Sequence, residues 1–269
     1  MANFFGQPGV YSQDQARRIL HRQLIYIVGF MTVFLMLIGL LSAYYRYPWT
    51  TIPAALLTLL IIHALNKPFE RKLDKLYKER LNYLLGREGE DLIAYYLSDL
   101  PDTWYVFNGI KLQGDFDLDH VVVGPGGLYY ISTKNIRGLI TTDQNGQVLH
   151  NNKPTDLLDK TLRQAMTLRE RLVAVMGTDA YINAVLAAPF IWVDLKNPHK
   201  NVWVLHRGNL INILEGSVKR LSEEQVGAYV KALEMIAGTA QSVRDMAKKA
   251  GLPSITPNAD RINDESLRQ

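Results

Sequence analysis

The chain has 269 residues, which is enough for one or two domains with a buried core. Hydrophobic residues make up 48% and charged residues 21%, which excludes bulk disorder, collagen-like repeats and a mostly hydrophobic multi-span transporter. The absence of cysteine excludes disulfides, thiolate metal sites and cysteine nucleophiles. The formal net charge of +4 points to a nucleic acid or an anionic membrane surface as a partner.

Two uncharged runs near the N-terminus predict a transmembrane helical hairpin. Residues 24–44 are apolar on every face and have the length of about 20 residues that crosses a bilayer. The second run, residues 49–65, has Pro53 near its start, where a missing N–H costs little. A buried hairpin of a soluble protein fits less well because the connection is so short, and a cleaved signal peptide fits poorly because no small-residue cleavage site follows.

The basic residues around these runs predict the orientation of the hairpin. Three Arg residues precede the first run and six Lys or Arg residues follow the second, whereas the connecting turn contains only Arg46. By the positive-inside rule the protein is an integral, two-pass membrane protein with both termini in the cytoplasm. Residues 1–80 hold ten basic against four acidic residues, and residues 81–269 hold 20 against 22. Any contact with DNA by the second part must therefore come from a local patch.

Beyond the second run, the pattern predicts one long helix or two helices over residues 68–100, with the break near Gly86. From about residue 103 apolar and polar residues alternate with a period of two, which is typical of strands, and the Asn145-Gly146 pair indicates a hairpin. The expected strands of this meander are residues 104–112, 116–123 and 128–135, followed by a hairpin over 139–150.

The remaining elements are two helices and two apolar strand segments. A helix is predicted over residues 155–176 with Thr155 as its N-cap, and another over 221–238 opened by a Ser222–Gln225 capping box. Strands are predicted over 182–194 and 201–214. This order indicates an α/β (α+β) domain in which helices flank a mixed sheet.

The hairpin around Gly124–Gly127 brings polar side chains together. If these four residues form the turn, Asp119 lies opposite Ser132 and Asp117 opposite Lys134, all on one face of the sheet. Two interpretations are open at this point. The row is either a solvated face with a cross-strand salt bridge, or a metal site in which a carboxylate binds Mg²⁺ and the lysine stabilises phosphate charge.

Residues 86–138 resemble the nuclease-related domain (NERD), a branch of the PD-(D/E)xK nuclease superfamily. The matching motifs are Gly86-Arg87-Glu88-Gly89-Glu90, Asp119-His120 before an apolar run, the glycine-rich turn, Lys134-Asn135 and Gly138, with Gln164 on a downstream helix. The resemblance implies a restriction-endonuclease-like fold and Mg²⁺-dependent hydrolysis of DNA phosphodiester bonds. It also implies that Glu90 and Asp119 hold the metal, and that Lys134 positions water or stabilises charge.

One position departs from the family pattern. The glutamate of the family's Glu-x-Lys motif is Ser132 here, and a neutral hydroxyl is a weak ligand for Mg²⁺. Asp117 could complete a metal site with Glu90 and Asp119. Equally, the domain could have kept the fold and lost cleavage, serving as a nucleic-acid- or protein-binding module at the membrane. A protein partner and a second copy of the chain both stay open.

Two further residues are expected to support the site rather than to hold the metal. These are Gln164, from the resemblance, and His120, which faces away from Asp119 and is expected to pack or hydrogen-bond. The predicted organisation is an N-terminal segment (1–23), the hairpin (24–66), a juxtamembrane helix (67–85), the NERD-like domain (86–250) and a polar tail (251–269).

Overall fold

The computed structural model describes residues 1–44, 48–112 and 117–249, and the chain forms two compact units. One unit contains residues 11–85, and the other contains residues 1–10 together with the chain from Gly86 onward. The predicted polar tail, residues 251–269, lies outside the described residues.

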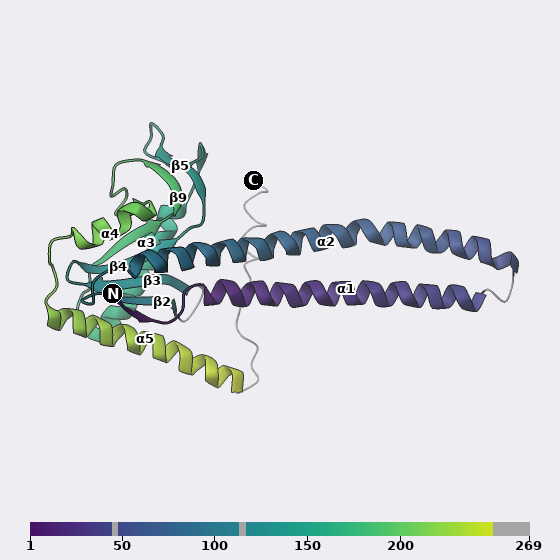
Figure 1. Ribbon diagram of the computed structural model, residues 1–269, viewed down its shortest axis with the longest axis horizontal. Helices are drawn as coiled ribbons and strands as arrows, with labels where there is room; N and C mark the ends of the chain where they lie inside the picture. The colour runs from purple at the N-terminus through teal and green to yellow at the C-terminus, as the bar shows by residue number, and fades with distance from the viewer. Residues whose placement is uncertain (45–47, 113–116, 250–269) are drawn as a thin grey trace. The chain divides into compact units, whose positions relative to one another are not determined.

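The first unit is formed by two long helices, α1 (Val10–Tyr44) and the part of α2 (Pro48–Leu97) that ends at Leu85 (Figure 1). They run antiparallel, since the ring of Tyr11 lies 6.5 Å from that of Tyr83 and the ring of Phe30 lies 4.2 Å from that of Phe69. Helix α2 has no break at Gly86, so the single-helix alternative is confirmed and the helix continues into the second unit.

One helix among the described residues is long and apolar enough to cross a membrane, over Val10–Leu37. Its apolar side chains are largely exposed, unlike those of a core helix in a soluble protein. The second predicted run is helical in its backbone, but most of its side chains lie outside the described part.

The second unit is built around a six-stranded mixed sheet of order β1-β2-β3-β4-β8-β10. The neighbours β2, β3 and β4 are antiparallel, whereas β1 is parallel to β2 and the strands β4, β8 and β10 are parallel to one another. The expected mixed sheet is confirmed, although β1 was not predicted. The strands are β1 (Asn3–Phe5), β2 (Tyr105–Lys111), β3 (Asp117–Gly124), β4 (Gly127–Thr133), β8 (Ile182–Ala187) and β10 (Val202–Leu205).

A second sheet has the strand order β7-β6-β5-β9 and contains the predicted hairpin over residues 139–150. The predicted hairpin is confirmed: β5 and β6 are antiparallel, and Gly146 in their turn has a φ of +75°. The apolar run 182–194 is not one strand, because Pro189 separates β8 in the first sheet from β9 in the second. The strands are β5 (Arg137–Thr142), β6 (Val148–His150), β7 (Lys153–Pro154) and β9 (Phe190–Asp194).

Helices cover both faces of the six-stranded sheet. One face carries α3 (Leu157–Met176) and α5 (Glu223–Lys249), and its apolar core includes Leu128, Tyr130, Leu168 and Leu233. The other face carries the end of α2 and α4 (Arg207–Glu215), and its core includes Ile93, Val122, Ile131 and Leu214. A sheet with helices on both faces is therefore the scaffold of this unit.

Three helix boundaries were tested by the structure. The Ser222–Gln225 capping box is confirmed by two hydrogen bonds, of 2.9 and 3.3 Å, although α5 continues past the predicted end to Lys249. The N-cap of α3 is Asp156 rather than Thr155, and its side chain makes no capping bond. The predicted strand over 201–214 is wrong in its second half, because α4 begins there after His206 accepts a hydrogen bond from the Gly208 N–H.

His120 is a buried polar residue on the α2 face of the main sheet. Its Nδ1 lies 2.7 Å from the Oδ1 of Asn108, so Nδ1 carries the proton that is donated to this oxygen. Burial lowers the pKa of His120 to about 3, because the charged imidazolium would be cut off from water.

This pKa predicts acid destabilisation. The unfolded state binds a proton on His120 below pH 6.5 and the folded state only below about 3, so stability present above pH 6.5 is lost as the pH falls. The expected loss from this group is about 2 kcal/mol at pH 5. Chemical denaturation of the full chain in detergent at pH 7 and pH 5 measures it, and His120→Gln should flatten the pH dependence. An equally steep dependence in that variant would assign the effect to other groups.

Candidate active site at one edge of the sheet

The parallel strands β4, β8 and β10 end at the same edge of the main sheet, where open α/β sheets commonly bind ligands. Strand β3 is antiparallel to β4, so its first residues lie at this edge as well. The observed pairs Val123–Leu128 and His120–Ile131 confirm the predicted register. If this register continues, Asp119 on β3 lies beside Ser132 on β4. Lys134 follows Ser132 by two residues.

The carboxylate of Asp119 is the centre of the contacts at this edge. Its Oδ2 accepts a hydrogen bond from the backbone N–H of Thr133 at 2.7 Å, and the Oγ of Ser132 donates to the same oxygen at 3.4 Å. The Nζ of Lys134 lies 4.0 Å from it. Two donors from β4 and the lysine that follows this strand therefore surround one oxygen of a carboxylate on β3.

Burial is the dominant influence on the charge of Asp119. It raises the pKa of this carboxyl, while the Lys134 ammonium, the Thr133 N–H and the Ser132 hydroxyl act in the opposite direction. Because these three groups do not fully offset the desolvation, the site favours an additional positive charge. Carboxylate oxygen is a ligand that Mg²⁺ prefers, so Asp119 is a candidate metal ligand.

Glu90 lies within electrostatic range of Tyr130, which shares a strand with Ser132. The pKa of Tyr130 is raised well above its usual value, first by burial and then by the negative charges of Asp119 and Glu90. The Tyr130 hydroxyl donates a hydrogen bond to the Oε1 of Gln164 at 2.9 Å. Helices α2 and α3 thus each contribute a polar side chain around Tyr130.

The start of the chain also reaches Glu90. The backbone N–H of Gly9 donates to the Glu90 Oε2 at 2.9 Å, and Gly9 has a φ of +66°, which glycine adopts most readily. This loop follows β1, which adds to the sheet as a parallel neighbour of β2. The N-terminal segment therefore orients a predicted metal ligand.

Asp117 has a different partner from the one expected. Its carboxylate lies 3.8 Å from the Nζ of Lys111, its neighbour across β2 and β3, whereas Lys134 is near Asp119. Strand β4 ends at Thr133, so the predicted pairing of Asp117 with Lys134 is not formed by the ladder. Within the part of the chain that the structure describes, no three His, Asp or Glu side chains are grouped to hold a metal ion.

The remaining predicted residues occupy distinct places. Ser132 is buried next to Asp119, and Gln164 reaches the site through Tyr130. His120 points to the opposite face of the sheet and contacts Asn108 instead of the site. Tyr130 itself was missed, although it shares a strand face with Ser132 two residues on, a signal that the alternation contains.

Helix α2 is held close to the end of β4 at Gly89. A Cβ added there would lie 2.9 Å from the Cβ of Asn135, the residue after Lys134. Real Cβ atoms rarely approach so closely, so any side chain at Gly89 would push α2 away from the site.

Two glycine substitutions test this contact. Replacing glycine by alanine inside a helix normally stabilises by about 0.5–1 kcal/mol. At Gly89 the clash costs about 1–3 kcal/mol and should outweigh that gain, so Gly89→Ala lowers the melting temperature. Gly227→Ala on α5 is the matched control, since a Cβ there meets nothing within 4 Å, and it should raise the melting temperature. Stabilisation by both changes would contradict the close approach of α2 to β4.

Comparison with known proteins agrees with the motifs at this edge. Residues 85–189 match the nuclease-related domain family, NERD, and this segment contains Glu90, Asp119, Ser132, Lys134 and Gln164. No curated protein and no solved structure was matched. The part of the chain that forms the candidate active site is thus similar to the nuclease-related domain.

Proposed function

We propose that this protein is a membrane-anchored, cytoplasmic nuclease-like protein that hydrolyses phosphodiester bonds in DNA with the help of Mg²⁺. The observation that carries the proposal is the 4.0 Å approach of the Lys134 ammonium to the Asp119 carboxylate, within a segment similar to the nuclease-related domain. A partly buried carboxylate beside a lysine at the carboxyl edge of a sheet is suited to binding a cation and a phosphate together. The helices on both faces of the mixed sheet are compatible with a restriction-endonuclease-like fold.

In this proposal Asp119 and Glu90 hold Mg²⁺, and Asp117 is a further candidate ligand if its contact with Lys111 opens. When bound, the ion would lower the pKa of a water molecule and offset negative charge on the phosphate. Lys134 stabilises the charge that develops on the phosphate oxygens or orients the attacking water. Gln164 and Tyr130 position the buried face of the site through their 2.9 Å hydrogen bond.

The alternative function is a catalytically inactive module that binds nucleic acid or a protein at the membrane. Ser132 favours it, because this buried hydroxyl occupies the place of the family's metal-binding glutamate and donates to Asp119 instead. A site with one acid fewer holds Mg²⁺ more weakly, yet the fold and its surface contacts would remain.

A cleavage assay with a lysine variant separates the two functions. The full chain in detergent is incubated with supercoiled plasmid and Mg²⁺ or Mn²⁺, and nicking is followed on gels. The wild type should nick the plasmid, and Lys134→Ala should lower the rate about 100-fold or more, as expected when a group that stabilises transition-state charge is lost. Lys153→Ala, an exposed lysine on β7, is the matched control and should cleave normally.

The other outcomes of this assay are equally informative. Normal cleavage by Lys134→Ala would rule out the proposed site. No cleavage, combined with DNA binding that weakens steeply with salt, would establish the inactive module. If the protein neither cuts nor binds DNA, both nucleic-acid functions are wrong, and a role in contacts with other proteins or a second copy becomes the explanation.

The membrane anchor rests on α1 and on the contacts beside it. The ammonium of Lys72 lies 5.8 Å from the centre of the Tyr26 ring, and tyrosine and lysine are typical of the membrane–water interface. From Tyr26 to the end of α1 at Tyr44 the helix is about 27 Å long, close to the thickness of a hydrocarbon core. This supports a two-pass hairpin with both termini in the cytoplasm.

The lack of cysteine makes the topology directly testable, because an introduced thiol is then the only one. Arg46→Cys, between the two uncharged runs of the sequence, should react with a membrane-impermeant maleimide in right-side-out vesicles. Asp14→Cys and Lys153→Cys should react only after the membrane is permeabilised. Labelling of either one in sealed vesicles would reverse the proposed orientation, and labelling of all three would argue against a membrane-spanning hairpin.

A further inference from the structure

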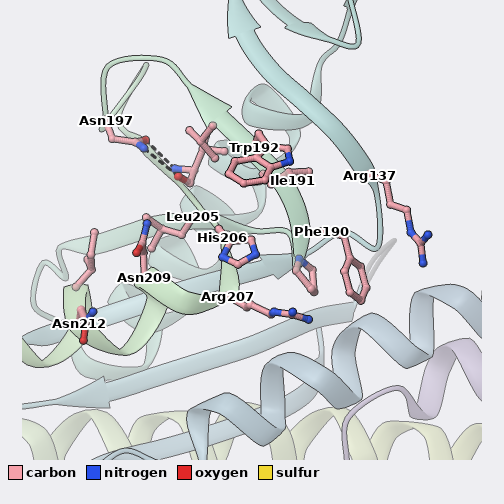
Figure 2. Close-up of a pocket in the computed structure, with 14 residues that line it drawn as sticks. Arg137, Phe190, Ile191, Trp192, Asn197, Leu205, His206, Arg207, Asn209 and Asn212 are labelled. Atoms are coloured by element: carbon pink, nitrogen blue, oxygen red, sulfur yellow. Dashed lines mark hydrogen bonds between the residues drawn. The ribbon is translucent and has the colours of Figure 1, made fainter.

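A cavity of about 760 Å³ lies between the two sheets' neighbouring strand ends, with Arg137, Phe190 and Arg207 in its lining (Figure 2). Its size falls in the range of about 300–1,000 Å³ that is usual for ligand sites. It is lined by the first residue of β5, by β9 and by the junction of β10 and α4. Because β8 and β10 end at the same edge as β4, the cavity lies on the Lys134 side of the sheet.

Two arginines line this cavity without an acidic partner. The guanidinium carbons of Arg137 and Arg207 each lie 5.2 Å from the centre of the Phe190 ring, so they are at most twice that distance apart. Figure 2 shows the two side chains flanking this ring. Among the residues that the structure describes, neither guanidinium has a carboxylate within ion-pair distance. Such a pair is suited to bind a phosphate through charge-assisted hydrogen bonds.

Trp192 supplies a flat apolar surface at the same cavity. Its side chain is 79% exposed, which is unusual for a residue that normally buries most of its area. Trp192 follows Phe190 by two positions on β9, so both side chains lie on the same side of the strand. An exposed indole in the same cavity as two arginines is a combination that single-stranded nucleic acid sites use for base stacking and phosphate binding.

Some polar side chains that line the cavity are used in hydrogen bonds within the protein, and others can bond to a ligand. Asn197 is structural, because its side chain donates to the carbonyl of Val204 and accepts from its N–H, both at 2.9 Å. His206 accepts a hydrogen bond at Nδ1, so the proton of the neutral ring is on Nε2 and can be donated. The amides of Asn209 and Asn212 make no side-chain hydrogen bond within the described chain.

We propose that this cavity binds one nucleotide unit of a single-stranded nucleic acid, with its phosphate on Arg137 and Arg207 and its base stacked on Trp192. The inference rests on the proposed nucleic-acid function and gives it a substrate form. A base in a duplex is already stacked and paired, so only an unpaired base can lie on the indole. Arg137 follows Lys134 by three residues. A nucleic acid strand bound in this cavity would therefore pass beside the candidate active site.

Binding of a labelled oligonucleotide tests the subsite. The full chain in a zwitterionic detergent, with EDTA to prevent cleavage, is titrated into fluorescein-labelled dT12 and followed by anisotropy. Trp192→Ala should weaken binding about tenfold or more, and Trp192→Phe should retain most of it, because a ring still stacks. Arg137→Ala combined with Arg207→Ala should weaken binding and make the salt dependence shallower by about 0.7 in the log–log slope, as expected for the loss of one phosphate contact.

Matched controls come from the opposite edge of the sheet. Tyr181 is 74% exposed and precedes the start of β8, so Tyr181→Ala removes an exposed ring far from the cavity. Arg220 is an exposed arginine whose backbone N–H bonds to Pro125 in the β3–β4 turn. Neither Tyr181→Ala nor Arg220→Ala should change the affinity for dT12, and melting temperatures verify that every variant is folded.

The outcomes separate this inference from the proposed function. If the wild type binds dT12 and the cavity variants bind it equally well, the subsite is wrong while the nucleic-acid function stands. If the wild type binds neither dT12 nor duplex DNA, the proposed function fails and the subsite with it. If polyglutamate or an abasic DNA strand displaces dT12 at concentrations similar to those of unlabelled dT12, the cavity recognises negative charge and not the base. Equally strong displacement by thymidine monophosphate would assign it to free nucleotides.

Discussion

The partly buried carboxylate of Asp119 and its 2.7 Å hydrogen bond from the Thr133 N–H hold the candidate site together. This bond ties the beginning of β3 to the end of β4, at the edge where β8 and β10 also end. Lys134 follows Thr133 directly, so its ammonium is brought to the same carboxylate. Helix α2 is then packed against this junction at Gly89, which brings Glu90 near enough to affect Tyr130.

The charges around Asp119 are compatible with both proposed functions, the Mg²⁺-dependent nuclease and the inactive binding module. Burial raises the pKa of Asp119 despite three favourable donors, so a cation would be stabilised there. Ser132 supplies a hydroxyl where a second acid would bind that cation more strongly. Beyond the site, Arg137 and Arg207 carry positive charge on a unit that is slightly acidic overall. They are a local concentration of positive charge, of the kind that the proposed binding of DNA would need on such a unit.

Much of the local structure could be predicted from residue patterns. The alternation over β3 and β4 and the glycine-rich turn between them were enough to set the register, because a one-residue slip would turn every buried side chain to the wrong face. The Ser222–Gln225 box marked the start of α5 for a similarly local reason. The segment 201–214 was misjudged because Leu210 and Leu214 fit a buried helix as well as a strand, and only packing against the sheet decides between them.

The sequence by itself determined the long apolar run of α1, the basic flanks, the mixed sheet and the motif that aligns Asp119 with Ser132, since these depend on spacing along the chain. Only the tertiary structure decided that Lys134 approaches Asp119 while Asp117 pairs with Lys111. It also decided that the N-terminal Gly9 binds Glu90, and that Arg137 and Arg207 share the Phe190 ring. Apart from the pair Lys111–Asp117, these contacts join residues farther apart along the chain, and they depend on how strands and helices pack together.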